Sequence, residues 1–250
     1  MSKEKIIVAL DVTTAKEARR IIEELRSEVG AFKIGLQLFT SEGASFVREA
    51  VEKNIEIFLD VKFHDIPNTV AKASIEAARL GVWMFNIHAS GGAEMMRRAV
   101  GEVSEVCARE NLRRPKIIGV TVLTSFDRNA LREVGIEAEM EKQVLNLAAL
   151  SAQCGLDGVV ASPLEIRAIR GGIERKDFTI ITPGIRSRES RVESRETKNE
   201  QQIAETSDDQ KRVMSAKEAI AAGADYLVIG RPITQANDKI LAVRKIVEEI

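Results

Sequence analysis

Eight short apolar runs alternate with segments of helical pattern along this chain of 250 residues, and this alternation constrains its fold more than any other feature. The runs cover residues 6–12, 31–39, 57–64, 82–89, 116–124, 156–162, 177–182 and 225–229. Strands that alternate with helices pair in parallel and are covered on both faces. Eight such units predict an α/β protein, a single (β/α)8 (TIM) barrel domain across residues 1–250. An open doubly wound sheet is the alternative, but no G-x-G-x-x-G follows the first run.

The second run, 31–39, is interpreted as one strand that carries a lysine. Side chains two residues apart share a face of a strand, so Lys33, Gly35 and Gln37 would lie on the same face. Ser41 follows the run and is expected to cap the next helix.

The composition argues against several classes of partner. Lys plus Arg number 37 and Asp plus Glu 38, so no basic field favours nucleic acid or an anionic membrane. Cys107 and Cys154 are the only cysteines and have no disulfide or zinc-site spacing. No apolar run approaches the roughly 20 residues of a membrane span, and no signal peptide precedes the first strand. We therefore expect a cytoplasmic protein that binds neither membrane nor nucleic acid.

Residues 57–69, I-F-L-D-V-K-F-H-D-I-P-N-T, concentrate charge in an apolar strand. Period-two alternation puts Asp60 and Lys62 on the same side, about 7 Å apart along the strand. Pro67 suits the first turn of a helix, so Asp65 falls in the turn before it. A solvated strand end with an incidental ion pair is the simplest alternative. Unpaired charge among apolar residues is costly, however, so we interpret the inward charged row as a functional site.

Polar residues also follow the other predicted strands, and in a (β/α)8 barrel the chemistry lies at the C-terminal strand ends. These residues are Asp11, Lys33, Asp60, Lys62, His88, Thr124, Ser162, Arg186 and Arg231. The last two strands run into Gly184-Ile185-Arg186 and Gly230-Arg231, and these two loops commonly bind phosphate in this fold. Glycine lets backbone N–H groups approach an anion, and arginine can bind it through two N–H groups. The alternative is that both arginines pair with surface carboxylates.

Lys33, Asp60, Lys62 and Asp65 form a row of alternating charge without an evident nucleophile or metal cluster beside it. An ammonium between two carboxylates stays protonated, because nearby opposite charge favours its charged form. It can donate a proton and stabilise a carbanion. A substrate carboxylate placed against Asp60 would be disfavoured, so loss of CO₂ followed by protonation fits the row. An aldol or isomerase step fits the same charges.

The segment L-D-V-K-F-H-D-I-P-N-T resembles the signature of the orotidine 5′-phosphate decarboxylase family. The resemblance extends over nearly the whole chain. Its other motifs are A-L-D at Asp11, F-K-I-G at Lys33, N-I-H-A at His88, V-T-V-L-T-S at Thr124, T-P-G-I-R at Arg186, D-Q-K-R at Gln210 and V-I-G-R-P-I-T at Arg231. D-x-K-x-x-D alone is shared with sugar-phosphate enzymes, but together with F-H-D-I-P-N-T and P-G-I-R it is much more specific.

The resemblance implies decarboxylation of orotidine 5′-monophosphate to UMP and CO₂, the last step of de novo pyrimidine (UMP) biosynthesis, without cofactor or metal. It implies catalytic roles for Lys62, Asp60, Asp65 and Lys33. Lys62 would protonate the C6 carbanion, and Asp60 would lie against the departing carboxylate. Substrate binding is implied for Asp11, Lys33, Asp60, Ile66, Thr69, Thr124, Arg186, Gln210, Gly230 and Arg231.

The same resemblance divides the binding tasks. Lys33 and Asp11 would hold ribose hydroxyls, and Thr124 would lie at the pyrimidine edge. The phosphate and base clamp would comprise Arg186, Gln210, Gly230 and Arg231. The resemblance also implies a homodimer in which Asp65 and Thr69 reach the site of the other subunit.

The chain departs from the family pattern between Arg186 and Gln210, where the interval is longer than usual. We expect the extra residues, about 187–207, to form a charged loop insertion over the phosphate site rather than a second domain. This leaves open whether Gln210 reaches the ligand. Two other functions remain: a sugar-phosphate decarboxylase or aldolase of the same fold that needs Mg²⁺, and a non-catalytic pyrimidine-nucleotide binder.

Overall fold

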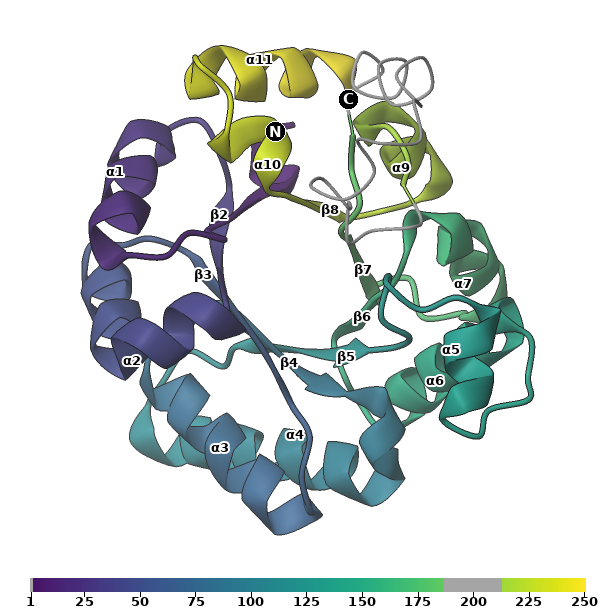
Figure 1. Ribbon diagram of the computed structural model, residues 1–250. Coiled ribbons are helices and arrows are strands. Elements are labelled where there is room, and N and C mark those ends of the chain that lie inside the picture. The colour runs from purple at the N-terminus through teal and green to yellow at the C-terminus, as the bar shows by residue number, and fades with distance from the viewer. Residues whose placement is uncertain (1, 187–212) are drawn as a thin grey trace.

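The computed structural model describes residues 2–186 and 213–250 and contains a closed barrel of eight parallel strands (Figure 1). Each strand pairs with the next one in the chain, and β1 closes the barrel by pairing with β8. The strands are β1 (Ile6–Ala9), β2 (Ala31–Gly35), β3 (Ile57–Phe63), β4 (Met84–His88), β5 (Lys116–Val120), β6 (Gly158–Val160), β7 (Thr179–Thr182) and β8 (Tyr226–Ile229). The predicted (β/α)8 barrel is therefore confirmed.

Helices form a ring around the outside of this barrel (Figure 1). They are α1 (Ala15–Leu25), α2 (Leu36–Glu52), α3 (Pro67–Arg79), α4 (Gly92–Glu110), α5 (Arg128–Glu133), α6 (Met140–Gln153), α7 (Ile166–Gly172), α9 (Ala216–Ala222), α10 (Arg231–Thr234) and α11 (Lys239–Glu249). Short 3₁₀ turns are η1 (Lys3–Lys5), η2 (Ala89–Gly91) and η3 (Pro163–Glu165). None of the helices in the described part of the chain could cross a membrane.

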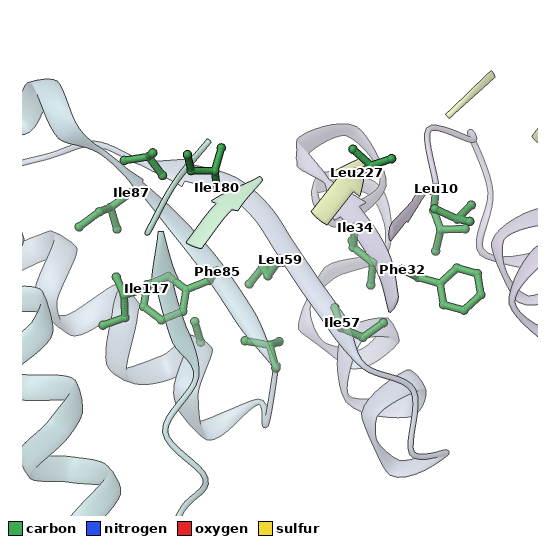
Figure 2. Packing of buried hydrophobic residues seen from close by; sticks show 14 of the residues in the cluster. Leu10, Phe32, Ile34, Ile57, Leu59, Phe85, Ile87, Ile117, Ile180 and Leu227 are labelled. Atoms are coloured by element: carbon green, nitrogen blue, oxygen red, sulfur yellow. The ribbon is translucent and has the colours of Figure 1, made fainter. Parts of the chain in front are cut away.

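Alternate residues of each strand face two separate apolar regions. On β3, Ile57 and Leu59 pack outward against the helices, whereas Phe58 packs inside the barrel. Figure 2 shows part of the outer region, including Phe85 and Ile117 from the next two strands. The inner region comprises Ile7, Ala9, Ala31, Phe58, Met84, Ile118, Ile181 and Val228. Because both faces are buried, the strands appear in the sequence as continuous apolar runs.

The barrel interior changes from apolar to polar along its axis. At the N-terminal end, Trp83 and Tyr226 meet edge to face with ring centroids 5.1 Å apart. Nearer the C-terminal ends of β2, β3 and β4, the inward positions hold Lys33, Asp60 and Asn86, all of them buried. Polar side chains thus gather at the end of the barrel where this fold places its chemistry.

The second predicted strand is wrong in its C-terminal half. β2 ends at Gly35 and α2 begins directly after it, so Gln37 lies on a helix and shares no strand face with Lys33. Ser41 lies within α2 instead of capping a helix. Gly43, with φ 69° and ψ −169°, interrupts α2. No helical period runs through the break, and a short apolar run does not by itself distinguish strand from helix.

Other predicted strands are correct in position but too long at their C-terminal ends. The fifth was expected over 116–124, and β5 ends at Val120. The residues beyond it leave the sheet, and Val122, Leu123 and Thr124 line a pocket instead. This segment is apolar because its residues line the pocket, not because they belong to a strand.

β3 is irregular at the charged positions. Leu59 pairs with Phe85 and Phe63 pairs with Ile87, so four steps along β3 match two steps along β4. Within this bulge Lys62 has φ 54°, a left-handed conformation that is unfavourable for a residue with a side chain. Bulges commonly redirect side chains next to functional sites.

Two aspartates tie neighbouring strands together at the N-terminal end of the barrel. Asp157, just before β6, accepts a hydrogen bond from the N–H of Ile117 at 2.7 Å and pairs with Arg114 at 2.9 Å. Asp225, just before β8, accepts from the N–H of Ile180 at 2.7 Å and also binds an arginine of α7. Each aspartate stands in a G-x-D sequence before an apolar run. These carboxylates fix strand pairs far from the polar end of the barrel.

We expect Asp157→Ala to lower the free energy of unfolding by about 1–3 kcal/mol, because the buried N–H of Ile117 loses its side-chain acceptor. Denaturant unfolding at neutral pH measures this loss. Asp177→Ala is the matched control, since Asp177 pairs with Arg175 but is 79% exposed, and we expect it to change stability by less than about 0.5 kcal/mol. Equal losses in the two variants would contradict the prediction.

Candidate active site

A pocket of about 520 Å³ opens at the C-terminal ends of the strands. Its volume is typical of small-molecule sites. Many residues predicted from the sequence line it: Asp11, Lys33, Asp60, Lys62, Thr124, Arg186, Gly230 and Arg231. The fold therefore brings these scattered residues to one place.

Asp60 is the centre of the charged wall of this pocket. Its Oδ1 accepts a hydrogen bond from Nζ of Lys62 at 2.7 Å, and its Oδ2 lies 3.3 Å from Nζ of Lys33. The ammonium of Lys33 also donates to Oδ1 of Asp11 at 3.0 Å. The side chains of Lys33 and Asp60 are 9% and 12% exposed, whereas those of Lys62 and Asp11 are 35% and 61% exposed. The two middle residues of the row, Lys33 and Asp60, are thus buried in the barrel, and the two end residues, Asp11 and Lys62, reach solvent.

Burial and charge act in opposite directions on the inner pair. Burial raises the pKa of the Asp60 carboxyl, but the charges of Lys33 and Lys62, with hydrogen bonds from Lys62 and Asn86, hold that pKa below its ordinary value. Burial lowers the pKa of Lys33, and the charges of Asp60 and Asp11 outweigh it, so this pKa lies above its ordinary value. Asp60 is therefore an anion and Lys33 a cation at neutral pH.

Gly35 leaves space for the row. A Cβ atom at this position would lie 3.0 Å from Nζ of Lys33 and 3.4 Å from Oδ1 of Asp11. The backbone there has φ −86° and ψ 176°, which other residues adopt without strain. At position 35 the limited space beside the charges favours glycine, whereas the backbone conformation does not.

Asp65, Ile66 and Thr69 do not line the pocket of their own chain. All three are exposed, Ile66 by 66%, and Oδ1 of Asp65 accepts from the N–H of Ile66 at 2.7 Å. Among the residues that the structure describes, Lys62 pairs with a single carboxylate, that of Asp60. The turn after β3 carries Asp65 outward, and the ammonium that lies between two carboxylates of this chain is that of Lys33, which contacts Asp60 and Asp11.

The arginine side of the pocket follows β7 and β8. Arg186 is held next to β7 by its N–H, which donates to the carbonyl of Met214 at 3.0 Å. Arg231 is the first residue of α10, directly after Gly230. Both arginines line the pocket with the charged row. Gln210 and the predicted insertion 187–207 lie outside the described residues.

Three polar residues near the pocket were not predicted as site residues. Gln37 and Gln235 line it from α2 and from the end of α10. Asn86 lies beneath it on β4, where its Nδ2 donates to Oδ1 of Asp60 at 2.7 Å and its Oδ1 accepts from the N–H of Lys62 at 2.8 Å. A polar residue at an inward position of an apolar strand was the signal for Asn86 in the sequence. The incorrect strand assignment placed Gln37 on the face of Lys33, but Gln37 was not predicted as a site residue.

The arrangement combines an ion pair open to the pocket with two arginines on the same cavity. Lys62 can place a proton and a positive charge in the cavity, and Asp60 places a negative charge beside it. The arginines offer donors suited to a phosphate or carboxylate. Within residues 2–186 and 213–250, no cluster of three or more His, Cys, Asp or Glu residues is arranged to hold a metal ion.

Residues 4–246 match the model of the orotidine 5′-phosphate decarboxylase / HUMPS family. The chain belongs to this family. The family residues thus extend from η1 to α11 and include every strand of the barrel.

Relatives in the family are similar along their whole length. An orotidine 5′-phosphate decarboxylase of Syntrophotalea carbinolica is 48% identical over 100% of this chain and 96% of its own. One of Moorella thermoacetica is 49% identical over 100% of this chain and 93% of its own. The crystal structure of orotidine 5′-phosphate decarboxylase from Lactobacillus acidophilus superposes with a TM-score of 0.80 at 32% identity, covering 98% of this chain and 97% of that one.

We expect Lys33→Met to lower the free energy of unfolding at pH 7 by about 3 kcal/mol, the lower end for breaking a buried ion pair, because Lys62 still neutralises Asp60. Loss of the Lys33 charge raises the pKa of Asp60, and protonation of Asp60 then removes the penalty. The deficit relative to wild type should therefore shrink as the pH falls through the raised pKa. Denaturant unfolding at several pH values measures it.

Lys53→Met is the matched control, because Lys53 pairs with Glu49 at 3.0 Å but is 48% exposed. Such a surface pair contributes about 0.5 kcal/mol or less. A Lys33→Met deficit as small as that of the control, or one independent of pH, would contradict the buried-charge interpretation.

Proposed function

We propose that this protein decarboxylates orotidine 5′-monophosphate to UMP and CO₂, the last step of UMP biosynthesis, without a metal or cofactor. The observation that carries the proposal is the Lys62–Asp60 ion pair in a pocket that also contains Arg186 and Arg231. It is supported by relatives of that name at 48% and 49% identity over the whole chain.

In the proposed reaction, the two arginines and Gly230 bind the phosphate, and the substrate carboxylate lies against Asp60. The C–C bond breaks, both electrons remain on C6, and CO₂ leaves. The ammonium of Lys62 stabilises the C6 carbanion and then transfers a proton to it, leaving a neutral amine that solvent reprotonates. Because the phosphate lies far from C6, its binding energy lowers the barrier only if it is realised in the transition state.

The remaining members of the site have binding roles in this proposal. Asp11 and Lys33, joined at 3.0 Å, hold ribose hydroxyls, and Thr124 lies at the pyrimidine edge. Gln210 belongs to the base and phosphate clamp by its match to the family motif. The cytoplasmic location stays a prediction from the sequence.

We further propose a homodimer in which Asp65, Ile66 and Thr69 complete the pocket of the partner subunit. Their exposure outside their own pocket supports this. The side chains of Leu36, 62% exposed at the start of α2, and Ile66, 66% exposed after β3, offer apolar surface for such a contact.

Lys62→Ala should reduce decarboxylation below detection while UMP still binds with near wild-type affinity, because the phosphate and ribose contacts remain. Loss of orotidine 5′-monophosphate absorbance measures turnover, and calorimetry measures UMP binding. The assay is run with and without EDTA. Wild-type activity lost in EDTA would favour the Mg²⁺-dependent sugar-phosphate alternative. Wild-type protein that binds UMP but shows no turnover would favour a nucleotide-binding protein.

Mixing Lys62→Ala with Asp65→Ala should restore about a quarter of wild-type activity after subunit exchange, since half of the dimers become heterodimers with one intact site each. Each variant alone should be nearly inactive. Mixing Lys62→Ala with Lys33→Met is the control: both lysines line the pocket of one chain, so neither site of a heterodimer is intact and no activity should return. If the first mixture stays inactive although exchange is complete, the shared-site proposal is wrong.

A further inference from the structure

Asn86 links the two central charges of the site and lies at the middle of β4, opposite the bulge of β3. Its side chain is fully buried, with 0% exposure. Its Nδ2 donates to Oδ1 of Asp60 at 2.7 Å, the oxygen that also accepts from Nζ of Lys62. Its Oδ1 accepts from the backbone N–H of Lys62 at 2.8 Å. One amide therefore contacts both the carboxylate of the ion pair and the backbone that carries the ammonium.

The second of these contacts stabilises an unfavourable backbone conformation. Between the pairs Leu59–Phe85 and Phe63–Ile87, residues 60–62 of β3 stand opposite Asn86 alone. Lys62 adopts φ 54° within this bulge. A buried N–H in an irregular strand needs an acceptor, and the amide oxygen of Asn86 supplies one. This bond fixes the direction in which the side chain of Lys62 leaves the strand.

The chemistry of the two partners requires an amide at this position. Asp60 is an anion with a lowered pKa, so the group that faces it must donate. The N–H of Lys62 must meet an acceptor. Asparagine satisfies both without adding charge, whereas a third cation beside Asp60 would compete with Lys33 and Lys62 for the carboxylate.

We propose that Asn86 is a positioning residue of the decarboxylation. It holds the carboxylate of Asp60 and, through the backbone of Lys62, the ammonium in the geometry that the reaction needs. The inference rests on the proposed function. Groups held by such contacts lose much of their effect when they move by about 1 Å, typically about 100-fold in rate.

The charged groups around Asn86 are known from every neighbouring element. Asp60 and Lys62 face it from β3, and Lys33 of β2 and Asp11 lie behind Asp60. His88, two residues along β4, lies near His64 with ring centroids 5.2 Å apart. On the other side, β5 pairs the apolar residues Ile118 and Val120 with Asn86 and His88. A new acid at position 86 would therefore interact most strongly with Asp60.

The decisive variant is Asn86→Asp, which keeps the shape and the acceptor but replaces the donor. Two carboxyl groups at hydrogen-bond distance raise the pKa of one of them. Below that pKa the new group is protonated and donates to Asp60, as the amide does. Above it the two carboxylates repel each other. The ratio of variant to wild-type kcat should therefore fall about tenfold per pH unit above the raised pKa and recover below it.

Asn86→Ala removes both contacts and should lower kcat about 100-fold at every pH. The affinity of either variant for UMP should stay within about threefold of wild type, because UMP lacks the carboxylate that faces Asp60. Ser151→Ala is the control for loss of a buried hydrogen bond, since Ser151 on α6 is 0% exposed and donates to the carbonyl of Leu147 at 2.7 Å. It should leave kcat unchanged.

The outcomes separate the two proposals. If wild type shows no decarboxylation, the proposed function is wrong. If wild type is active but Asn86→Asp has a constant kcat ratio across pH, or Asn86→Ala loses no more than the Ser151→Ala control, the role of Asn86 is wrong. If neither variant at position 86 folds, Asn86 serves folding rather than positioning, and the proposal is overturned as well.

Discussion

The carboxylate of Asp60 must remain charged in the interior of a barrel that is otherwise filled with apolar side chains. An isolated anion there would take up a proton, because burial penalises its charged form. Two ammonium groups and one amide keep the carboxylate charged. The nitrogen atoms of Lys62 and Asn86 lie 2.7 Å from its oxygens, and that of Lys33 lies 3.3 Å away. Three different strands supply these donors. The charge state of the site therefore depends on the pairing of β2, β3 and β4 and not on one strand alone.

The charged site and the contacts that stabilise the barrel lie at opposite ends of it. At the N-terminal end, the carboxylates of Asp157 and Asp225 bind backbone N–H groups of neighbouring strands, and Trp83 contacts Tyr226 across the interior. At the C-terminal end, the strands give way early to loops that form the pocket wall. A bulge and a left-handed lysine are tolerated there because regular pairing continues below them.

Much of the fold was predictable because its signal is local and repeated. Eight apolar runs with helical segments between them specify the barrel, and the strand-end rule then gathers residues such as Asp11 and Arg231 at one pocket.

Reasoning from the local sequence failed where the geometry depends on a neighbouring strand or segment. The run at 31–39 has no pattern that separates β2 from α2. The period-two argument placed Asp60 and Lys62 on one side of a regular strand, but β3 is bulged there and their charged groups form an ion pair at 2.7 Å. The importance of Asn86 follows only from the register of β4 against β3.

The empty space at Gly35 has a consequence for how this sequence can vary. The backbone at this position accepts any residue, so alanine would seem harmless by conformational criteria. The added methyl group would nevertheless lie 3.0 Å from Nζ of Lys33 and move that ammonium relative to Asp60. The smallest possible side chain would thus act on the molecule as an electrostatic mutation. A site built from charges also depends on the space beside them, so a substitution that removes no polar group can still change its electrostatics.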